Sequence, residues 1–72
     1  METELEFKNI IKEFLNENGI TQSDFARKIG IKPGLVNDWV RGKAKPGYDN
    51  LKMMAKVFNV PANYFLGLTE EY

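Results

Sequence analysis

The 72-residue sequence predicts a small all-α domain built from five short helices. Apolar residues recur at intervals of three and four along the chain, as they do on one face of a helix. No run of four or more residues alternates between apolar and polar in the way that a half-buried strand does. A glycine or proline opens or closes each apolar segment and so limits its length. We therefore expect residues 1–72 to form one domain, with its core between about residues 7 and 67.

The first helix is expected to begin after Thr3, because Thr3 and Glu6 have the spacing of a capping box. Its apolar positions share one face and are Phe7, Ile10, Ile11, Phe14 and Leu15. Gly19 suits the left-handed backbone conformation that ends many helices. The first helix is thus predicted to pack one apolar stripe against the rest of the chain.

A second and a third helix follow closely. Thr21 is predicted to cap the second helix, which Gly30 ends. Pro33 suits the first turn of the third helix, because its missing N–H would have no partner there. In that helix Val36, Trp39 and Val40 are expected to point inward, and Gly34, Asn37, Asp38 and Arg41 outward. Two short helices joined by such a tight link predict a helix-turn-helix over about residues 21–41.

The remaining segments predict a basic loop and two more helices. The loop over residues 43–47 contains two lysines. A fourth helix is expected from about Tyr48 to Phe58, with an inward face of Leu51, Met54, Ala55 and Phe58, and with Met53 off that face. A short fifth helix is expected from Ala62 to Leu66. Phe65 is expected in the core, whereas Tyr64 and Leu68 suit either the core or a dimer patch.

The composition argues against catalysis. The chain contains neither histidine nor cysteine, so it lacks the commonest general base and the usual soft metal ligands. We expect no enzyme activity, no catalytic residue, no metal, no cofactor and no small-molecule ligand. No apolar run approaches the roughly 20 residues that span a bilayer, so we expect a cytoplasmic protein without a membrane segment.

Charge is unevenly distributed, although basic and acidic residues are equal in number. Residues 1–20 hold five acids and two bases, residues 21–60 hold eight bases and three acids, and residues 61–72 hold two acids. A basic middle segment indicates an anionic partner. The same distribution is also compatible with ordinary solvated surface charge.

The spacing of the middle segment resembles the phage-repressor-like helix-turn-helix family, which includes the Cro and lambda repressors and is often called the XRE family. The matching stretches are Ile20-Thr21-Gln22, Phe25-Ala26-Arg27-Lys28-Ile29-Gly30-Ile31, Trp39 with Arg41-Gly42-Lys43, Lys45-Pro46, Leu51, Ala55 and Phe65-Leu66-Gly67. The resemblance covers about residues 7–67. It implies a five-helix lambda-repressor-like fold and a transcriptional regulator, most often a repressor. Family members bind double-stranded DNA, usually as a homodimer on a near-palindromic operator.

The resemblance also implies roles for individual residues. Positions that touch base edges or the adjoining backbone in the family are Lys32, Pro33, Gly34, Asn37 and Asp38 here. Positions that contact phosphates in the family are Gln22, Arg41, Lys43, Lys45, Gly47 and Tyr48 here. In the family, an ending such as residues 66–69 often leads into a linker and a further domain.

Four positions depart from the family pattern. One is Gly34, which lowers the stability of the third helix by up to about 1 kcal/mol against alanine. Lys32 stands where the family usually has Ser or Thr, so the third helix loses a side-chain cap and gains a cation at the positive end of its dipole. Asp38 places negative charge on a surface expected to face phosphates. Val40 stands where the family often has Glu.

The proposed contact residues also have plainer interpretations. Asn37 and Asp38 are typical of a solvated helix face, and Asp38 and Arg41 have the spacing of an ion pair within one turn. The neutral total charge and Asp38 favour an alternative function, which is a protein-interaction module on the same fold, such as an antitoxin or antirepressor component. A steep loss of affinity with salt distinguishes DNA binding from that alternative.

Overall fold

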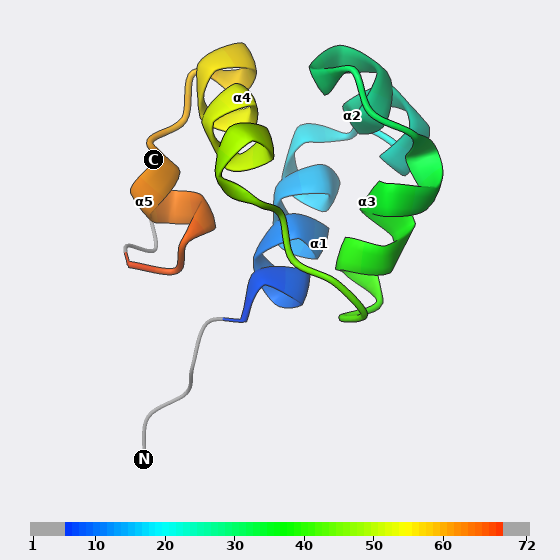
Figure 1. Cartoon of the computed structure of the whole chain (residues 1–72), viewed down its shortest axis with the longest axis horizontal. Coiled ribbons are helices and arrows are strands. Elements are labelled where there is room, and N and C mark those ends of the chain that lie inside the picture. Colours follow the sequence, from blue (N-terminus) through cyan, green and yellow to red (C-terminus); the bar gives the residue numbers. More distant parts are fainter. Residues whose placement is uncertain (1–5, 69–72) are drawn as a thin grey trace.

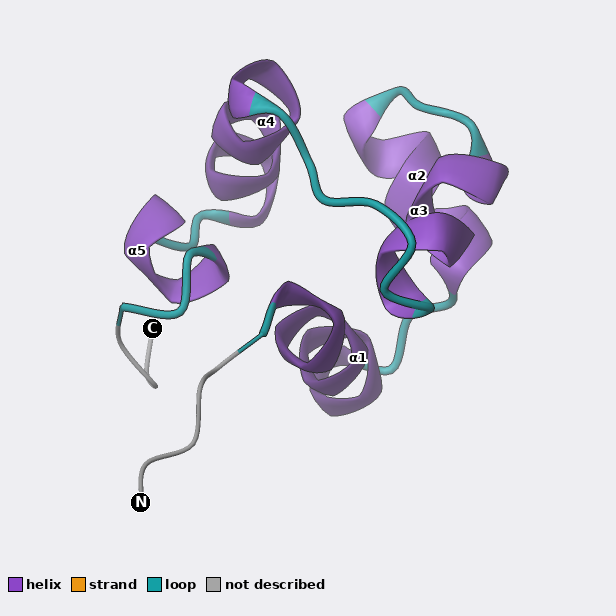
Figure 2. Ribbon diagram, turned by 60° about the horizontal axis from the view of Figure 1, so that its bottom comes forward, coloured by secondary structure: helices purple, strands orange, loops and turns teal. Residues whose placement is uncertain are grey.

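The computed structural model describes residues 6–68, which fold into five helices without a strand (Figures 1 and 2). The helices are α1 (Phe7–Asn18), α2 (Gln22–Ile29), α3 (Pro33–Val40), α4 (Tyr48–Phe58) and α5 (Ala62–Phe65). Figure 1 shows α1 in the middle, with α2 and α3 on one side and α4 and α5 on the other. The predicted all-α class with five helices is confirmed.

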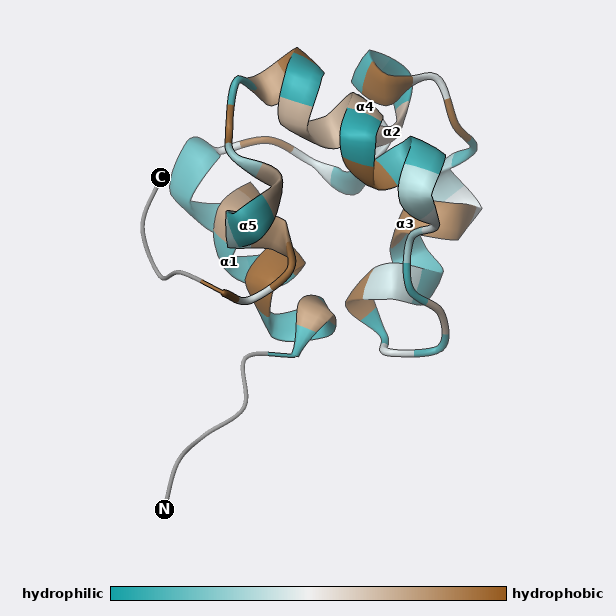
Figure 3. Ribbon diagram, turned by 60° about the vertical axis from the view of Figure 1, so that its left-hand side comes forward, coloured by the Kyte–Doolittle hydropathy of each residue, from teal (hydrophilic) through white to brown (hydrophobic). Residues whose placement is uncertain are grey.

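Aromatic rings form the centre of the core. Phe14 lies edge-on to Phe58 and Phe65, with ring centroids 5.3 Å away in both pairs. Phe25 of α2 stacks on Phe58 of α4 at 4.9 Å and 12°. The Phe25–Phe58 stack joins the two sides of the molecule directly, and Phe14 connects α1 to α4 and α5. Figure 3 shows hydrophilic and hydrophobic stretches along the helices, as expected when each helix buries one face.

The predicted inward positions are largely confirmed. All five apolar positions of the predicted stripe on α1 are buried, and so are Val36, Trp39, Met54 and Phe65. Leu51 and Phe58 are half-buried and pack against the core. Met53 is 42% exposed, as expected for a residue off the stripe. Of the two undecided residues, Tyr64 is buried and Leu68 is 72% exposed.

The start of α1 differs from the prediction. Glu6 was expected inside the helix, but it is the N-cap residue, with an extended backbone and no side-chain capping bond. Thr3, the expected cap, lies outside the described residues. Phe7 is the first buried residue of α1 and packs edge-on against Trp39 at 5.7 Å. The helix therefore begins at a residue that packs on the core, because packing contributes more to a helix in a protein than local capping signals do.

Three other predicted helix ends are confirmed in detail. The Thr21 hydroxyl accepts a hydrogen bond from the N–H of Asp24 at 3.0 Å and so caps α2. Gly19 and Gly30 end α1 and α2 with φ angles of 64° and 78°. The end of α4 uses Asn59 in the same left-handed region, at φ 57°. Asn tolerates this conformation better than most residues do.

Candidate nucleic-acid interface

The geometry of α2 and α3 leaves one face of α3 uncovered. Ala26 is completely buried where the helices meet, and its carbonyl accepts a hydrogen bond from the N–H of Ile31 at 3.0 Å. Val36 and Trp39 are also completely buried and fix α3 against the core. The predicted helix-turn-helix, in which one helix supports and the other presents its outer face, therefore has the expected packing.

The residues expected to contact bases lie along the uncovered face. Lys32, Pro33 and Gly34 are exposed at the start of α3, and Asn37 and Asp38 are half-buried in its middle. Lys32 is the N-cap residue, has an extended backbone and makes no side-chain capping bond. The start of α3 therefore lacks a side-chain cap, as predicted from Lys32.

A hydrogen bond joins two of the predicted contact residues. Asn37 Nδ2 donates to Gln22 Oε1 at 3.2 Å, which links the first residue of α2 to the middle of α3. Both side chains are half-buried. Because Gln22 accepts from Nδ2 of Asn37, the side-chain oxygen Oδ1 of Asn37 and the second N–H of its side-chain amide stay available. The bond thus fixes the rotation of an amide that carries both an acceptor and a donor.

The Asp38–Arg41 ion pair left open by the sequence does not form within residues 6–68. Arg27 instead pairs with Asp24 on α2, where both side chains are substantially exposed. Arg41 is exposed at the end of α3, and the carbonyl of Asp38 accepts a backbone hydrogen bond from Lys43 at 2.8 Å. This bond holds the start of the basic loop against the last turn of α3.

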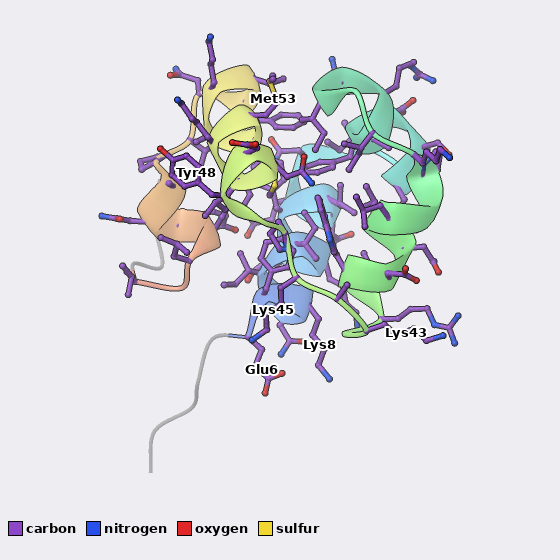
Figure 4. The ribbon with its side chains drawn as sticks, in the orientation of Figure 1. Glu6, Lys8, Lys43, Lys45, Tyr48 and Met53 are labelled. Atoms are coloured by element: carbon purple, nitrogen blue, oxygen red, sulfur yellow. The ribbon has the colours of Figure 1, made fainter. Side chains whose placement is uncertain are left out.

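The remaining predicted phosphate contacts divide between two places. Lys43 lies three residues after the end of α3, whereas Lys45 lies nearer to Glu6, which precedes α1 (Figure 4). Gly47 and Tyr48 form the start of α4, where Tyr48 is 75% exposed and the Lys52 ammonium lies 5.9 Å from its ring centroid. The structure thus brings Gln22 and Asn37 together and places Lys45 and Tyr48 away from them.

Lys8 joins the basic end of the molecule, and sequence reasoning did not include it. It lies in the first turn of α1, yet Figure 4 shows it at the same end as Lys43 and Lys45. A Cβ atom added to Gly42 would lie only 2.9 Å from Lys8 Cδ, so the Lys8 side chain lies across Gly42. No signal in the sequence could have found Lys8, because it belongs to the acidic first segment and approaches the loop only through the fold.

Two kinds of feature are absent from residues 6–68. None of the helices has the length and apolar character needed to cross a membrane. Within the same residues, no three Asp or Glu side chains group in a way that would hold a metal ion.

Comparison with known proteins identifies the family. Residues 11–65 match the helix-turn-helix family. The chain belongs to this family. The predicted five-helix fold agrees with the solution structure of the DNA-binding domain of the P22 c2 repressor, which matches with a TM-score of 0.80 at 22% identity. That comparison covers 100% of this chain and 96% of the other.

Two curated proteins are similar in sequence to this helix-turn-helix domain. A multi-protein-binding factor 1 of Yarrowia lipolytica is 40% identical over 45 residues, which are 62% of this chain and 30% of that protein. An uncharacterized HTH-type transcriptional regulator of Bacillus subtilis, YobD, is 28% identical over 61 residues, which are 85% of this chain and 54% of that protein. The chain therefore spans about a third to a half of the length of these relatives.

Proposed function

We propose that this helix-turn-helix domain is a sequence-specific DNA-binding transcriptional regulator that acts as a cytoplasmic repressor. The observation that carries the proposal is the uncovered face of α3, with polar groups in its middle and cations at both ends. Lys32 stands at its start and Arg41 and Lys43 at its end, all three exposed. A helix with this distribution fits the major groove, because its centre meets base edges and its ends meet the phosphates of the flanking strands.

The phosphate contacts of the proposal come from cations and helix starts. Arg41 and Lys43 hold phosphates on one side of the groove, and Lys8 and Lys45 extend the positive charge beyond them. Gln22 begins α2, and Gly47 and Tyr48 begin α4, so their backbone N–H groups lie at helix N-termini that favour anions. The family match over residues 11–65 and the regulator name of the Bacillus subtilis relative support this assignment.

Base recognition in the proposal centres on Asn37 and Asp38. Adenine offers a donor and an acceptor in the major groove, which an Asn amide matches, and cytosine offers a donor that Asp accepts. The hydrogen bond that Asn37 Nδ2 donates to Gln22 Oε1 holds the Asn37 amide in one rotation, so less conformational entropy is lost when the amide binds a base. Pro33 and Gly34 have no polar side-chain group, and they contribute close backbone approach to the bases or to the adjoining strand.

One domain of this size covers one half-site, so the proposed operator is near-palindromic and bound by a homodimer. Selection of bound sequences from a random pool of DNA duplexes tests the near-palindromic operator and the homodimer at once. The expected result is a repeated half-site with centres about one helical turn apart, roughly 34 Å. Recovery of unrelated sequences would contradict sequence-specific binding.

A second candidate is a protein-interaction module on the same fold. Its support is the neutral total charge and the acidic Asp38 in the middle of the α3 face. The two candidates differ in salt dependence, because DNA binding releases counterions and weakens steeply as salt rises.

A further inference from the structure

A pocket of about 270 Å³ lies between the start of α1, the loop before α4, α4 itself and the end of α5. It is on the side of the molecule away from α2 and α3 (Figure 1). Its lining residues come from four separate stretches of the chain, and the fold alone brings them together. This is why the sequence predicted no small-molecule ligand.

Most of the pocket lining is apolar. Phe7 and Phe65 are buried, and Leu51 is half-buried. Leu66 lines the pocket and is 53% exposed, so it leaves apolar surface that a ligand can cover. By comparison, a cavity of about 150 Å³ in another protein holds benzene, and sites for drug-sized ligands begin near 300 Å³. The pocket therefore suits a small ligand with one ring or one branched aliphatic group.

Two opposite charges complete the lining. Glu6 and Lys45 are its charged residues, and both are exposed. Figure 4 shows them at the same end of the molecule. Within residues 6–68, neither of them takes part in an ion pair. The carboxylate and the ammonium are therefore both available to a ligand that occupies the pocket.

The charge pair selects the class of ligand. An apolar carboxylic acid would match Lys45 but would place a like charge beside Glu6, and an apolar amine would match Glu6 but would place a like charge beside Lys45. An α-amino acid carries an ammonium, a carboxylate and a side chain on one carbon atom. It is the smallest common ligand that offers a partner to both charges and an apolar group to the pocket.

We propose that this pocket binds a free α-amino acid with an apolar side chain. The side chain packs on Phe7, Leu51 and Phe65, the ligand ammonium donates to the Glu6 carboxylate, and Lys45 donates to the ligand carboxylate. The site does not involve the face of α3. One consequence rests on the proposed function: Lys45 is also a proposed phosphate contact, so a ligand held there competes with DNA for this residue.

Titration of the whole chain with L-phenylalanine, in the absence of DNA, tests the site by amide NMR. Concentrations up to about 20 mM cover the dissociation constant of about 1 mM expected for a ligand of this size. The amide signals of the lining residues should shift, and those of Gln22 and Asn37 should not. L-Serine keeps both charges but lacks the ring, and it should bind at least about tenfold more weakly because it buries little apolar surface.

Two analogues of phenylalanine assign each charge to its partner. The first, 3-phenylpropanoate, lacks the ammonium, and the second, 2-phenylethylamine, lacks the carboxylate. Lys45→Gln should weaken phenylalanine and 3-phenylpropanoate by about fivefold, the upper end for an exposed ion pair, and should not weaken 2-phenylethylamine. Glu6→Gln should weaken phenylalanine and 2-phenylethylamine to a similar degree and should not weaken 3-phenylpropanoate.

Matched variants outside the pocket control for net charge and for apolar surface. Glu13→Gln and Lys28→Gln change exposed residues of α1 and α2 outside the pocket lining, and both should leave the binding of all three aromatic ligands unchanged. Leu66→Ala should weaken all three ligands. Met53→Ala removes an exposed apolar side chain of α4 outside the lining and should weaken none of them.

Three results would overturn the proposal. They are lining amides that do not shift at the highest phenylalanine concentration, serine that binds as tightly as phenylalanine, and charge variants of Glu6 and Lys45 that change the binding of all three aromatic ligands alike. The titrations contain no DNA, whereas the proposed function is tested by selection of DNA duplexes without ligand. A failed ligand site and a failed DNA function therefore give different outcomes.

Discussion

Gly30 and Gly34 are four residues apart and serve different purposes. Gly30 has φ 78°, in the left-handed region that side chains disfavour, and an added Cβ would meet no atom within 4 Å. The requirement for glycine at this position is therefore conformational. Gly34 lies in the first turn of α3 and also has open space around an added Cβ, but its φ is outside the left-handed region.

These two glycines should respond oppositely to alanine. Gly30→Ala should destabilise the domain by about 1–2 kcal/mol, which is the cost of the left-handed conformation for an L-residue. Gly34→Ala should stabilise it by up to about 1 kcal/mol, because alanine favours the helix and restricts the unfolded chain. Urea unfolding of both variants measures the difference. Equal midpoints would show that the tight turn does not need Gly30.

Gln22 and Asn37 are linked in the free domain, so their effects on binding should be coupled. Asn37→Ala should cost about 1–3 kcal/mol per half-site on the preferred duplex and little on a scrambled one. The double variant Gln22→Ala/Asn37→Ala should depart from additivity by at least about 0.5 kcal/mol on the preferred duplex. Fluorescence anisotropy with both duplexes measures these values.

Ser23→Ala is the control for this cycle, because Ser23 is an exposed neighbour of Gln22 on α2 and has no hydrogen bond to Asn37. It should combine additively with Asn37→Ala. Equal losses for Asn37→Ala on both duplexes would leave DNA binding in place but remove Asn37 from base recognition.

At the scale of elements, the sequence predicted helix bounds correctly where the capping residues and the apolar stripe indicate the same bounds. The bounds of α4 were predicted to the residue, because Gly47 and Asn59 flank an apolar stripe of matching length. The start of α1 was predicted wrongly, because the helix begins at the buried Phe7 and Glu6 is its N-cap residue, so the spacing of Thr3 and Glu6 does not mark the start. Lys8 and the bond between Gln22 and Asn37 depend on how helices approach in space, which spacing along one helix does not encode.

The start of α3 is less stable than a capped helix start would be. Lys32 has the extended backbone of an N-cap residue but supplies no capping acceptor. Lys32→Ser should add a hydrogen bond to the N–H of Gly34 or Leu35 and stabilise the domain by about 0.5–2 kcal/mol. Lys32→Ala removes the same cation without supplying a cap, so the difference between the two variants isolates the cap. Thermal unfolding measures it, and identical stabilities would show that this helix start is not limited by its cap.

Both Lys32 variants should also bind DNA more weakly, and to a similar degree, because each loses one positive charge beside the groove. A more stable domain with weaker binding is the pattern expected when a functional surface breaks local rules of helix formation. Stronger binding by Lys32→Ser than by the parent would contradict a role for Lys32 in the interface.

At the scale of the whole molecule, a chain with no net charge can still bind an anion through the arrangement of its charges. The exposed cations Lys32, Arg41 and Lys43 lie along α3 and the loop after it, whereas Lys52 and Lys56 lie on α4. Only protein cations that lie near the DNA backbone displace the counterions of its phosphates on binding. Position should therefore matter more than the number of lysines.

Salt dependence separates these two groups of cations. Lys43→Ala should weaken binding to all duplexes about equally and should flatten the slope of log affinity against log salt by about two for a dimer, since each copy loses one phosphate contact. Lys56→Ala removes the same charge from α4 and should leave the slope unchanged. Anisotropy titrations at several salt concentrations measure both slopes. Equal flattening of the slope by the two variants would mean that net charge alone drives binding. A parent whose affinity does not change with salt would favour the protein-interaction module, because association through an apolar surface releases few ions.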